Sequence, residues 1–480
     1  MNIRFILYIL GSLLCLESGL LIIPLVVALL YGEPVWLPIL YSSAITLIIG
    51  WIFAYSNKNC SKEIGKREGF IIVGAVWIVF AFFGSLPFVF SGCVSSMTDA
   101  FFEAMSGFTT TGSTIIRDIE VLPHGLLFWR ALMHFTGGIG ILVLCIAVLP
   151  IFGIGSMNIY QAETSTVSIG EKFSPRIKDT AKRVFRIYLI ITASCILFYL
   201  PAMDFFDAVC HAFSTTATGG FSTRNASMGD FPVYTQYVTI FFMILGSCPF
   251  VLFFYVWKRE FGKISQNDEF RFYLIIILIA SLFICIGLLI NKQGFESSIR
   301  ESVFNVVSMI STTGYVVGDY MQWSPPMWLI IFLIAFIGGC AGSTSGGLKV
   351  VRLLLLIRMI PMQLKKIMYQ NAIVPVKLNK HTVTEDRMYR ILAFFVIFLC
   401  IYIAGVFILV ICGLNFTTAA GTSIACLANT GPGLDLTGPS NNFGHLPVAA
   451  KWICSFLMLF GRLEVYSILI LFSPAFWRKQ

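Results

Sequence analysis

Charged residues are scarce in this chain: only 12% of its 480 residues are Asp, Glu, Lys or Arg, whereas 57% are hydrophobic. Soluble proteins average about 25% charged and about 45–50% apolar residues, so the composition excludes a soluble protein. Histidine is also rare, with five residues scattered along the sequence. They do not form the His, Asp and Glu clusters that a membrane-embedded enzyme requires. We therefore expect a polytopic membrane protein that has no catalytic residues and no cofactor of its own.

Long polar segments are missing as well. The longest runs from about 365 to 387, which is too short for a catalytic or nucleotide-binding domain, so any control by nucleotides must come from another subunit. The 13 cysteines are odd in number and form no Cys-x-x-Cys pair, which argues against a metal site. The apolar run from Ile3 to about Tyr31 exceeds the roughly 7–15 residues of a signal-peptide core, so we expect a retained first span.

Ten apolar stretches approach the roughly 20 residues needed to cross a bilayer. Their spacing predicts an all-α membrane protein with two leader spans in residues 1–68. Four parallel repeats of span, half-helix, loop and span would follow, at 69–160, 161–258, 259–362 and 363–480. The half-helices are expected at about 99–108, 205–215, 301–309 and 417–427. Parallel repeats pack around an axis along the membrane normal, which suggests a central pore.

Most of the 33 basic residues lie in links on one side of the predicted spans. The runs are Arg4, 58–67, 172–186, 258–271, 349–390 and 478–479. By the positive-inside rule this side is cytoplasmic, and so are both termini. The net charge of +9 therefore reflects membrane topology, and it does not indicate binding to nucleic acid. Anionic lipid head groups or an acidic partner remain secondary interpretations of the basic surplus.

A Thr-Gly pair follows each of the four predicted half-helices. Non-helical backbone survives at membrane depth only where protein or water surrounds it, so these loops are expected to line an aqueous path. Backbone carbonyls replace the water shell of a monovalent cation, and glycine reaches the backbone angles that align them. The predicted ion-binding residues are Thr110, Thr111, Gly112, Ala217, Thr218, Gly219, Thr312, Thr313, Gly314, Asn429, Thr430 and Gly431. Thr-Gly also occurs at 136–137 and 437–438, and interhelical packing by glycine is the alternative interpretation.

Another unusual run interrupts the second span of the third repeat. It is built of small residues, and its members are Gly338, Gly339, Cys340, Ala341, Gly342, Ser343, Thr344, Ser345, Gly346 and Gly347. Such a run does not hold a stable helix, and it lacks the Gly-Lys-Ser/Thr end of a phosphate-binding loop. A passive helix break is the alternative to a functional segment. Lys349 follows directly, either at the inner mouth or as a cytoplasmic anchor.

Arg462 lies inside the last predicted span, between two apolar runs. A buried arginine in a membrane must face water or a partner. In a cation pore it would repel bound ions; a salt bridge, for example to Glu464, is the alternative. Seven outer acidic residues would raise the local cation concentration at an outer vestibule, although solvated half-helix ends explain several of them equally well: Asp99, Glu103, Asp204, Asp207, Asp230, Asp319 and Asp435. Arg130 and His134 are expected to form core hydrogen bonds.

With these loops, the Gly-rich run and Arg462, the chain resembles the Trk/Ktr/HKT superfamily of potassium transporters, most closely the bacterial TrkH type. The segments that carry the resemblance are Thr-Thr-Thr-Gly-Ser at 109–113, Ala-Thr-Gly-Gly-Phe-Ser-Thr at 217–223, Ser-Thr-Thr-Gly-Tyr at 311–315 and Ala-Asn-Thr-Gly-Pro-Gly at 428–433. The two leader spans favour the TrkH type over the shorter Ktr type. The resemblance covers essentially the whole chain.

The resemblance implies potassium uptake across the bacterial inner membrane through a selectivity filter. Its glycines would be Gly112, Gly219, Gly314 and Gly431, and glycine in the first repeat is associated with potassium rather than sodium. The run 338–347 would be a flexible intramembrane gate, with an arginine at 462 just below the filter. The implied partners are a cytoplasmic nucleotide-binding TrkA-type regulatory subunit and a second copy of the chain in a homodimer.

Two other functions remain open from the sequence. One is a sodium- or proton-coupled potassium symporter, for which Arg462 is a poor coupling group because it does not titrate. The other is a less selective monovalent cation transporter, since only one glycine is common to all four loops. The chain also departs from the expected pattern at Pro249, where many relatives are expected to place asparagine. This proline is expected to kink the second span of the second repeat.

Overall fold

The computed structural model describes residues 2–60, 65–140, 177–369 and 374–478, and these residues are mostly helical. The helices are α1 (Ile3–Leu30), α2 (Trp36–Ser56), α3 (Lys66–Gly84), α4 (Leu86–Phe90), α5 (Met97–Phe108), α6 (His124–Gly138), α9 (Ile177–Tyr199), α10 (Phe205–Thr216), α11 (Val233–Ser247), α12 (Phe250–Trp257), α13 (Phe261–Ser265), α14 (Asp268–Ile290), α15 (Phe295–Ile310), α16 (Pro325–Ile337), α17 (Val350–Met368), α18 (Glu385–Ile411), α19 (Phe416–Leu427), α20 (Val448–Arg462), α21 (Tyr466–Phe472) and α22 (Pro474–Trp477).

Short 3-10 helices occur in the loops, namely η2 (Ser227–Asp230), η3 (Tyr320–Gln322) and η4 (Asp435–Thr437). Two strands, β1 (Lys377–Leu378) and β2 (His381–Thr382), pair antiparallel in the polar stretch near 365–387. Asn379 and Lys380 between them have φ of 48° and 68°, the left-handed pair of a tight hairpin turn. The predicted repeat boundary at residue 160 and the basic residues Lys62, Lys172, Arg176 and Lys479 lie outside the described residues.

Membrane spans of the expected kind are present. Among the described residues, five helices are each long and apolar enough to cross a bilayer. They are α1 (Ile3–Leu30), α2 (Trp36–Ser56), the stretch Arg67–Phe90 of α3 and α4, α14 (Asp268–Ile290) and α18 (Glu385–Ile411). The bent pairs α11 with α12 and α20 with α21 raise the number to seven. Helices α6, α9, α16 and α17 lie where the remaining spans were expected, so the all-α polytopic class is confirmed and the count of ten stays a prediction.

Both bent pairs break for identifiable reasons. Helix α11 ends at Ser247, Pro249 caps α12, and the two axes differ by 98°. The kink expected at Pro249 is therefore confirmed, because proline removes a helical hydrogen bond. The second break follows Arg462, where Glu464 and Val465 have φ of 51° and 47° and the axes differ by 115°. This break is not predicted from the sequence, because Gly461 directly before Arg462 does not take positive φ and no proline follows it there.

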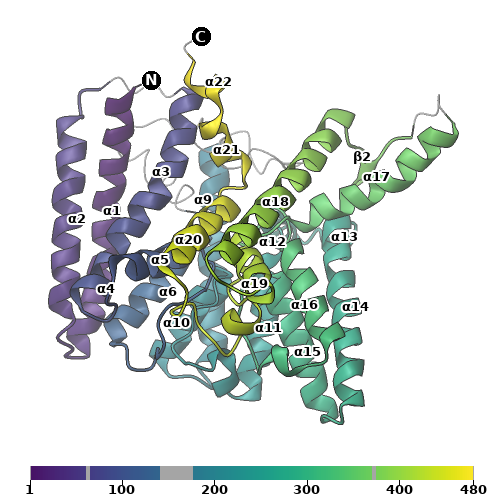
Figure 1. The fold of residues 1–480 in the computed structure, drawn as a ribbon, viewed down its shortest axis with the longest axis horizontal. Coiled ribbons are helices and arrows are strands. Elements are labelled where there is room, and N and C mark those ends of the chain that lie inside the picture. The colour runs from purple at the N-terminus through teal and green to yellow at the C-terminus, as the bar shows by residue number, and fades with distance from the viewer. Residues whose placement is uncertain (1, 61–64, 141–176, 370–373, 479–480) are drawn as a thin grey trace.

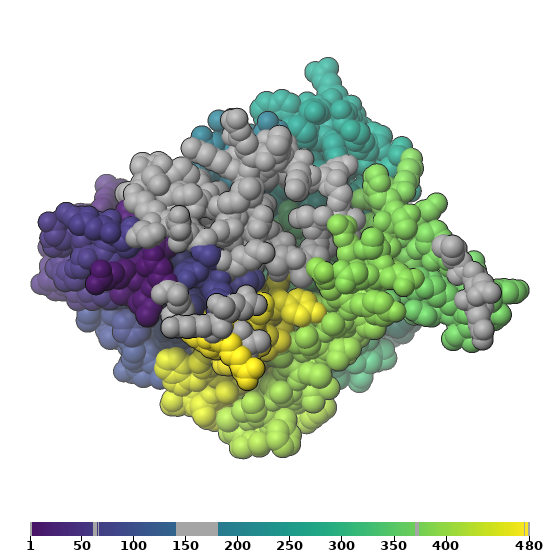
Figure 2. All heavy atoms as spheres, turned by 90° about the horizontal axis from the view of Figure 1, so that it is seen from above, coloured from purple at the N-terminus to yellow at the C-terminus, as the bar shows by residue number. Residues whose placement is uncertain are grey.

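The chain winds around the molecule from the leader helices to the C-terminal segment. Figure 2 shows the purple N-terminal segment at the left, the teal and green segments at the right, and the yellow C-terminal segment at the bottom, next to the N-terminal third. Figure 1 shows both ends of the chain on the same side of the molecule. One large core cluster runs from Phe5 to Ile468, and a second, smaller one lies between α17 and the β-hairpin.

The leader helices α1 and α2 approach each other through two glycines. A Cβ on Gly50 would lie 2.9 Å from the carbonyl oxygen of Gly11, and a Cβ on Gly11 would lie 2.6 Å from the carbonyl oxygen of Gly50. Close approach through small residues is how membrane helices gain packing contacts. Gly19, on the exposed side of α1, has nothing within 4 Å of its Cβ position.

We expect Gly50→Leu to destabilise the protein by about 1–3 kcal/mol, the usual cost of forcing a large side chain into a packed contact. The measurement is the thermal unfolding of the purified protein in detergent. Gly19→Leu is the matched control, because it gives the same gain in helix propensity without the steric overlap. Equal unfolding temperatures for the two variants would show that the glycine contact does not hold the leader pair together.

Candidate ion pathway: four loops and a Gly-rich segment

Four short helices end next to one another's loops. They are α5, α10, α15 and α19, with C-caps at Thr109, Ala217, Ser311 and Ala428. All four lie where the sequence predicts half-helices, and residues in their last turns are buried. A helix C-terminus carries a partial negative charge and favours cations nearby. The five residues from each cap onward are called loop 1 (109–113), loop 2 (217–221), loop 3 (311–315) and loop 4 (428–432).

The four loops share one backbone conformation. The residue after each cap is left-handed, with φ of 54° at Thr110, 53° at Thr218, 57° at Thr312 and 55° at Asn429. For β-branched threonine this region is a genuine outlier. Two residues further on comes a glycine with positive φ, and these glycines are Gly112 (82°), Gly220 (87°), Gly314 (78°) and Gly431 (98°). Strained residues persist where the surroundings over-determine them, which is typical of functional sites.

Loop 2 is displaced by one residue from the alignment expected on the Thr-Gly pairs. The residue between the two left-handed positions donates its N–H to a carbonyl in the last turns of the preceding helix in every loop. The pairs are Thr111 to Ser106 (2.9 Å), Gly219 to Ser214 (2.8 Å), Thr313 to Ser308 (2.9 Å) and Thr430 to Ala425 (2.9 Å). The counterpart of Gly112 is therefore Gly220, and Gly219 corresponds to the threonines. The Gly-Gly pair at 219–220 is the sequence signal for this displacement.

The loops close into a ring. A Cβ on Gly112 would lie 2.1 Å from the carbonyl oxygen of Gly219, and a Cβ on Gly220 would lie 2.0 Å from that of Thr313. In the same way, a Cβ on Gly314 would lie 2.0 Å from the carbonyl oxygen of Thr430, and a Cβ on Gly431 would lie 2.8 Å from that of Thr111. Each glycine thus packs against the carbonyl of the next loop, in the order 1, 2, 3, 4 and back to 1.

These four carbonyls form one level of the ring, and they have no partner in the described part of the chain. No hydrogen bond reaches the oxygen of Thr111, Gly219, Thr313 or Thr430 from any described residue. The hydroxyl of Thr430 is also buried without a partner among these residues. Buried polar groups are normally hydrogen-bonded, so four bare oxygens at one level are suited to a bound cation.

The threonine hydroxyls of loops 1, 2 and 3 have different partners. The Thr111 hydroxyl bonds to Thr109 (2.8 Å) and that of Thr313 bonds to Ser311 (2.7 Å). In loop 2 the Thr218 hydroxyl turns inward, toward Ala217 O (2.7 Å) and the hydroxyl of Thr344 (3.2 Å). Loop 2 contributes only backbone at the shared level, since its residue there is Gly219.

The Gly-rich segment (338–347) lies against the inner ends of the loops. Thr344 donates its hydroxyl to the carbonyl oxygens of Thr216 (3.2 Å) and Gly246 (3.0 Å). Gly346 donates its N–H to the hydroxyl of Thr312 at 2.7 Å, and a Cβ on it would lie 2.4 Å from Ala428 O. The segment therefore contacts loops 2, 3 and 4 at or beside their helix caps, and not at the ring glycines.

The remainder of the segment folds back on itself. Gly338 and Gly347 both have φ of 73°, and a Cβ on Gly338 would lie 2.3 Å from Gly346 O. Its two ends are thus adjacent. Ser343 bonds to Ser345 (2.6 Å), Gly342 O accepts from Phe250 N (3.0 Å), and Gly339 O accepts from Val350 N (3.0 Å). These contacts hold the segment in a compact loop between α16 and α17.

Two basic residues fasten this segment. Arg462 donates to Thr344 O (2.8 Å) and to the carbonyl oxygens of Gly137 (2.5 Å) and Gly138 (3.1 Å) at the end of α6. Lys349 is buried, caps α17 and donates to Ser345 O. It therefore belongs to the segment and is not an exposed cytoplasmic anchor. Glu464 is the acid that the sequence offers as a salt-bridge partner of Arg462. In the structure, Arg352 forms an ion pair with Glu464 at 2.5 Å.

Two of the outer acidic residues, Glu103 and Asp99, form ion pairs with basic residues on other helices. Glu103 is fully buried and pairs with Arg130 at 2.9 Å, so the expectation that it faces an outer vestibule is wrong. The core role expected for Arg130 and His134 is confirmed by buried hydrogen bonds, including His134 Nδ1 with Ser214 Oγ at 2.8 Å. Asp99 pairs with Lys451 at 2.6 Å.

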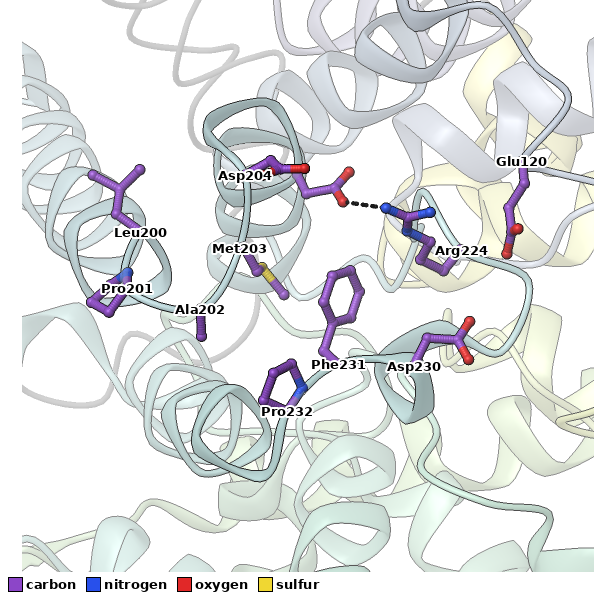
Figure 3. Close-up of a pocket in the computed structure, with 11 residues that line it drawn as sticks. Glu120, Leu200, Pro201, Ala202, Met203, Asp204, Arg224, Asp230, Phe231 and Pro232 are labelled. Carbon is purple, nitrogen blue, oxygen red and sulfur yellow. Dashed lines mark hydrogen bonds and ion pairs between the residues drawn. The ribbon is translucent and has the colours of Figure 1, made fainter.

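Asp204, Asp207 and Asp230 line an open cavity of about 870 Å³ together with Glu120. Figure 3 shows Glu120 and Arg224 on one side of this cavity, and its dashed line marks the 3.0 Å ion pair of Arg224 with Asp207. Asp319 lines a second cavity of about 420 Å³ beside Asp230. Asp435 accepts hydrogen bonds from Asn415 and Thr418, which hold the pKa of its carboxyl below the ordinary value.

Four loops joined in a ring, among helices long and apolar enough to cross a bilayer, are the arrangement expected of a membrane transport protein. The family model described as TrkH, cation transport protein, matches residues 38–479. The chain belongs to this family, as its resemblance predicted, and the family is one of transporters rather than enzymes.

Relatives agree over the full length of the chain. It is 39% identical over 489 residues to the Trk system potassium uptake protein TrkH of Escherichia coli (strain K12), and 36% identical over 485 residues to the protein of the same name from Halomonas elongata. In both cases 100% of each chain is covered. The crystal structure of the potassium transporter TrkH from Vibrio parahaemolyticus is similar with a TM-score of 0.88, 34% identity and 100% coverage of both chains.

Proposed function

We propose that the chain takes up potassium across a bacterial inner membrane, and that the ring of loops 1–4 is its selectivity filter. The observation that carries the proposal is the ring level formed by the carbonyl oxygens of Thr111, Gly219, Thr313 and Thr430, each packed against a glycine of the preceding loop and each without a hydrogen bond from a described residue. Carbonyl rings replace the hydration shell of potassium. The relatives named as potassium uptake proteins support this choice of ion.

The filter in this proposal consists of the residues expected from the sequence, with Gly220 added. Thr110, Thr111 and Gly112, Thr218 and Gly219, Thr312, Thr313 and Gly314, and Asn429, Thr430 and Gly431 supply the backbone of the ring. Ala217 is the cap of α10. Four helix C-termini direct their partial negative charges toward the same place, which favours a cation over an anion.

The gate in this proposal is the Gly-rich segment with Lys349 and Arg462. The segment contacts three loops, and Arg462 connects it to α6 below the first loop. The structure is then a closed state, in which two cations lie beside the inner ends of the loops and oppose entry of an ion. Opening requires Thr344 and Gly346 to leave their partners.

The membrane arrangement follows from the same proposal. Both termini are cytoplasmic, residues 1–68 are leader spans, and the four repeats follow at 69–160, 161–258, 259–362 and 363–480. The regulatory partner is a cytoplasmic nucleotide-binding subunit of the TrkA type, and the chain is a homodimer with one pore in each copy. The cytoplasmic basic links and the β-hairpin at 377–382 offer the surface on which such a subunit would dock.

The test is rubidium uptake into proteoliposomes that contain the purified chain, with potassium, sodium or lithium as unlabelled competitor. We expect potassium to compete at a lower concentration than sodium. Equal competition by sodium would make the protein an unselective monovalent cation transporter. A pH or sodium gradient that drives uptake without a potassium gradient would favour the symporter instead.

The displaced alignment of loop 2 gives a sharper prediction. Gly220→Ala places a Cβ 2.0 Å from the backbone oxygen of Thr313 at a φ of 87°, whereas the Cβ of Gly219→Ala meets the side chain of His134 at 2.3 Å. Backbone of a neighbouring loop cannot move without breaking the ring, while a side chain can shift. We expect Gly220→Ala to reduce potassium preference about tenfold, or about 1.4 kcal/mol, and Gly219→Ala to reduce it less. If Gly219→Ala reduces the potassium preference more than Gly220→Ala in the same competition assay, the alignment of loop 2 on Gly219 is correct instead.

A further inference from the structure

A buried ion pair lies behind loops 1 and 2. Arg130 Nε on α6 is 2.9 Å from Glu103 Oε1 on α5, and the two side chains are 1% and 0% exposed. Charges inside a membrane protein are costly unless each one is paired and hydrogen-bonded. Neither residue contacts the Gly-rich segment through a hydrogen bond, so the gate does not explain the pair.

Glu103 holds the outer end of loop 1. Its carboxylate accepts the hydroxyl of Thr114 at 3.0 Å and the N–H of Ile115 at 3.0 Å. Thr114 is two residues beyond Gly112, so these bonds fix the direction in which the chain leaves the ring. Hydrogen bonds to an ionised carboxylate are about twice as strong as neutral ones.

Arg130 holds the outer end of loop 2. Its Nη1 donates to Ser222 O at 3.1 Å, and its guanidinium carbon lies 4.0 Å from the ring centre of Phe221. Phe221 directly follows Gly220, and the ring of His134 stacks on it with 4.1 Å between ring centres. One charged network thus joins two loops whose glycines and carbonyls touch in the ring.

In the described structure, the side-chain hydrogen bonds that directly join the other loops come from neutral groups, while the Asp99–Lys451 ion pair joins helices α5 and α20. The Tyr315 hydroxyl donates to Phe221 O (3.2 Å) between loops 2 and 3, and the Tyr320 hydroxyl donates to Gly433 O (2.7 Å) next to loop 4. Ser113 donates to Gly431 O (2.8 Å) between loops 1 and 4. The junction between loops 1 and 2 therefore differs in kind.

We propose that Glu103 and Arg130 are positioning residues for ion selectivity: their ion pair sets the spacing of loops 1 and 2, and so the position of the Gly219 carbonyl relative to Gly112. This inference rests on the proposed filter. A small displacement of one carbonyl changes the coordination available to potassium more than that available to the smaller sodium ion. Loss of the pair then lowers selectivity without removing any ring atom.

The experiment is the rubidium competition assay on Glu103→Gln, Arg130→Lys and the double variant Glu103→Gln/Arg130→Met. We expect each single variant to lower the ratio of sodium to potassium half-inhibitory concentrations about tenfold, or about 1.4 kcal/mol. The double variant leaves no unpaired charge, so its effect is expected to be smaller than the sum of the single effects. Arg300→Lys is the matched control, because Arg300 forms a 2.9 Å ion pair with Glu296 and no hydrogen bond to a loop.

Folding is checked by thermal unfolding in detergent. Thr114→Val keeps both charges and removes one donor to Glu103, so it remains informative if the charge variants do not fold. We expect it to lower the ratio by a smaller factor. Unchanged ratios in variants that unfold at the parental temperature would overturn the proposal. If Gly112→Ser alters selectivity and these variants do not, the filter stands and only the positioning role fails; if Gly112→Ser has no effect, the filter itself is wrong.

Discussion

Replacing Gly112 by serine is expected to abolish most of the preference for potassium over sodium. The backbone at Gly112 has a φ of 82°, and a Cβ there would lie 2.1 Å from the carbonyl oxygen of Gly219. A left-handed conformation costs a non-glycine residue about 1–3 kcal/mol, and the overlap is with backbone of the next loop. Loops 1 and 2 must therefore separate, and the carbonyl level of the ring opens.

The measurement is the ratio of sodium to potassium concentrations that halve rubidium uptake. We expect a decrease of about tenfold or more, which is about 1.4 kcal/mol for each factor of ten. The control is Gly92→Ser, because Gly92 has a similar φ of 71° with nothing within 4 Å of its Cβ position. It reproduces the backbone strain without the collision. If both variants keep the parental ratio, loop 1 does not line the selective path.

Deleting residues 340–345 is expected to raise rubidium uptake in the absence of any regulatory subunit. The deletion removes Thr344 and its contacts with Thr216, Gly246 and Arg462. Because Gly338 lies against Gly346 and Gly347, the shortened chain closes without separating α16 from α17. We expect an increase of about tenfold, since loss of several hydrogen bonds of about 0.5–1.5 kcal/mol each shifts a two-state equilibrium by that order.

A point variant tests the same segment with less disturbance. Thr344→Val keeps the side-chain shape and removes the hydroxyl, so we expect a smaller increase in the same direction. Thr46→Val is the matched control, because Thr46 is buried in the leader helix α2 and bonds only to Ser42 O within the described residues. Uptake that stays at the parental level in a correctly folded deletion protein would show that the segment does not close the path.

Much of the architecture could be predicted because it depends on local composition. The half-helices were expected within about six residues of their observed starts, and α19 was expected one residue from its start at Phe416. The kink at Pro249 was also foreseen, since proline acts on its own helix. The break after Arg462 was not, because it is made by positive φ at Glu464 and Val465, and neither residue type favours that conformation.

In the candidate site, too, the features set by local sequence could be predicted and those set by packing could not. Three loops could be aligned on their Thr-Gly pairs, but loop 2 contains Gly219 and Gly220 in succession, and the sequence cannot say which one takes positive φ. Glu103 looked like a vestibule acid because nothing in the sequence places Arg130, 27 positions away, beside it. Side-chain partners across elements depend on packing, and packing is absent from a linear pattern.

The sequence by itself determined that this is a helical membrane protein of the TrkH family with four short helices that each end in a Thr-Gly loop, because hydrophobic length and glycine placement act locally on each segment. Only the tertiary structure decided that Gly220 rather than Gly219 closes the ring, that the Gly-rich segment lies under three of the loops, and that Glu103 and Arg130 join two of them. These features arise where segments distant in sequence meet, and their geometry is fixed by contacts that no single segment contains.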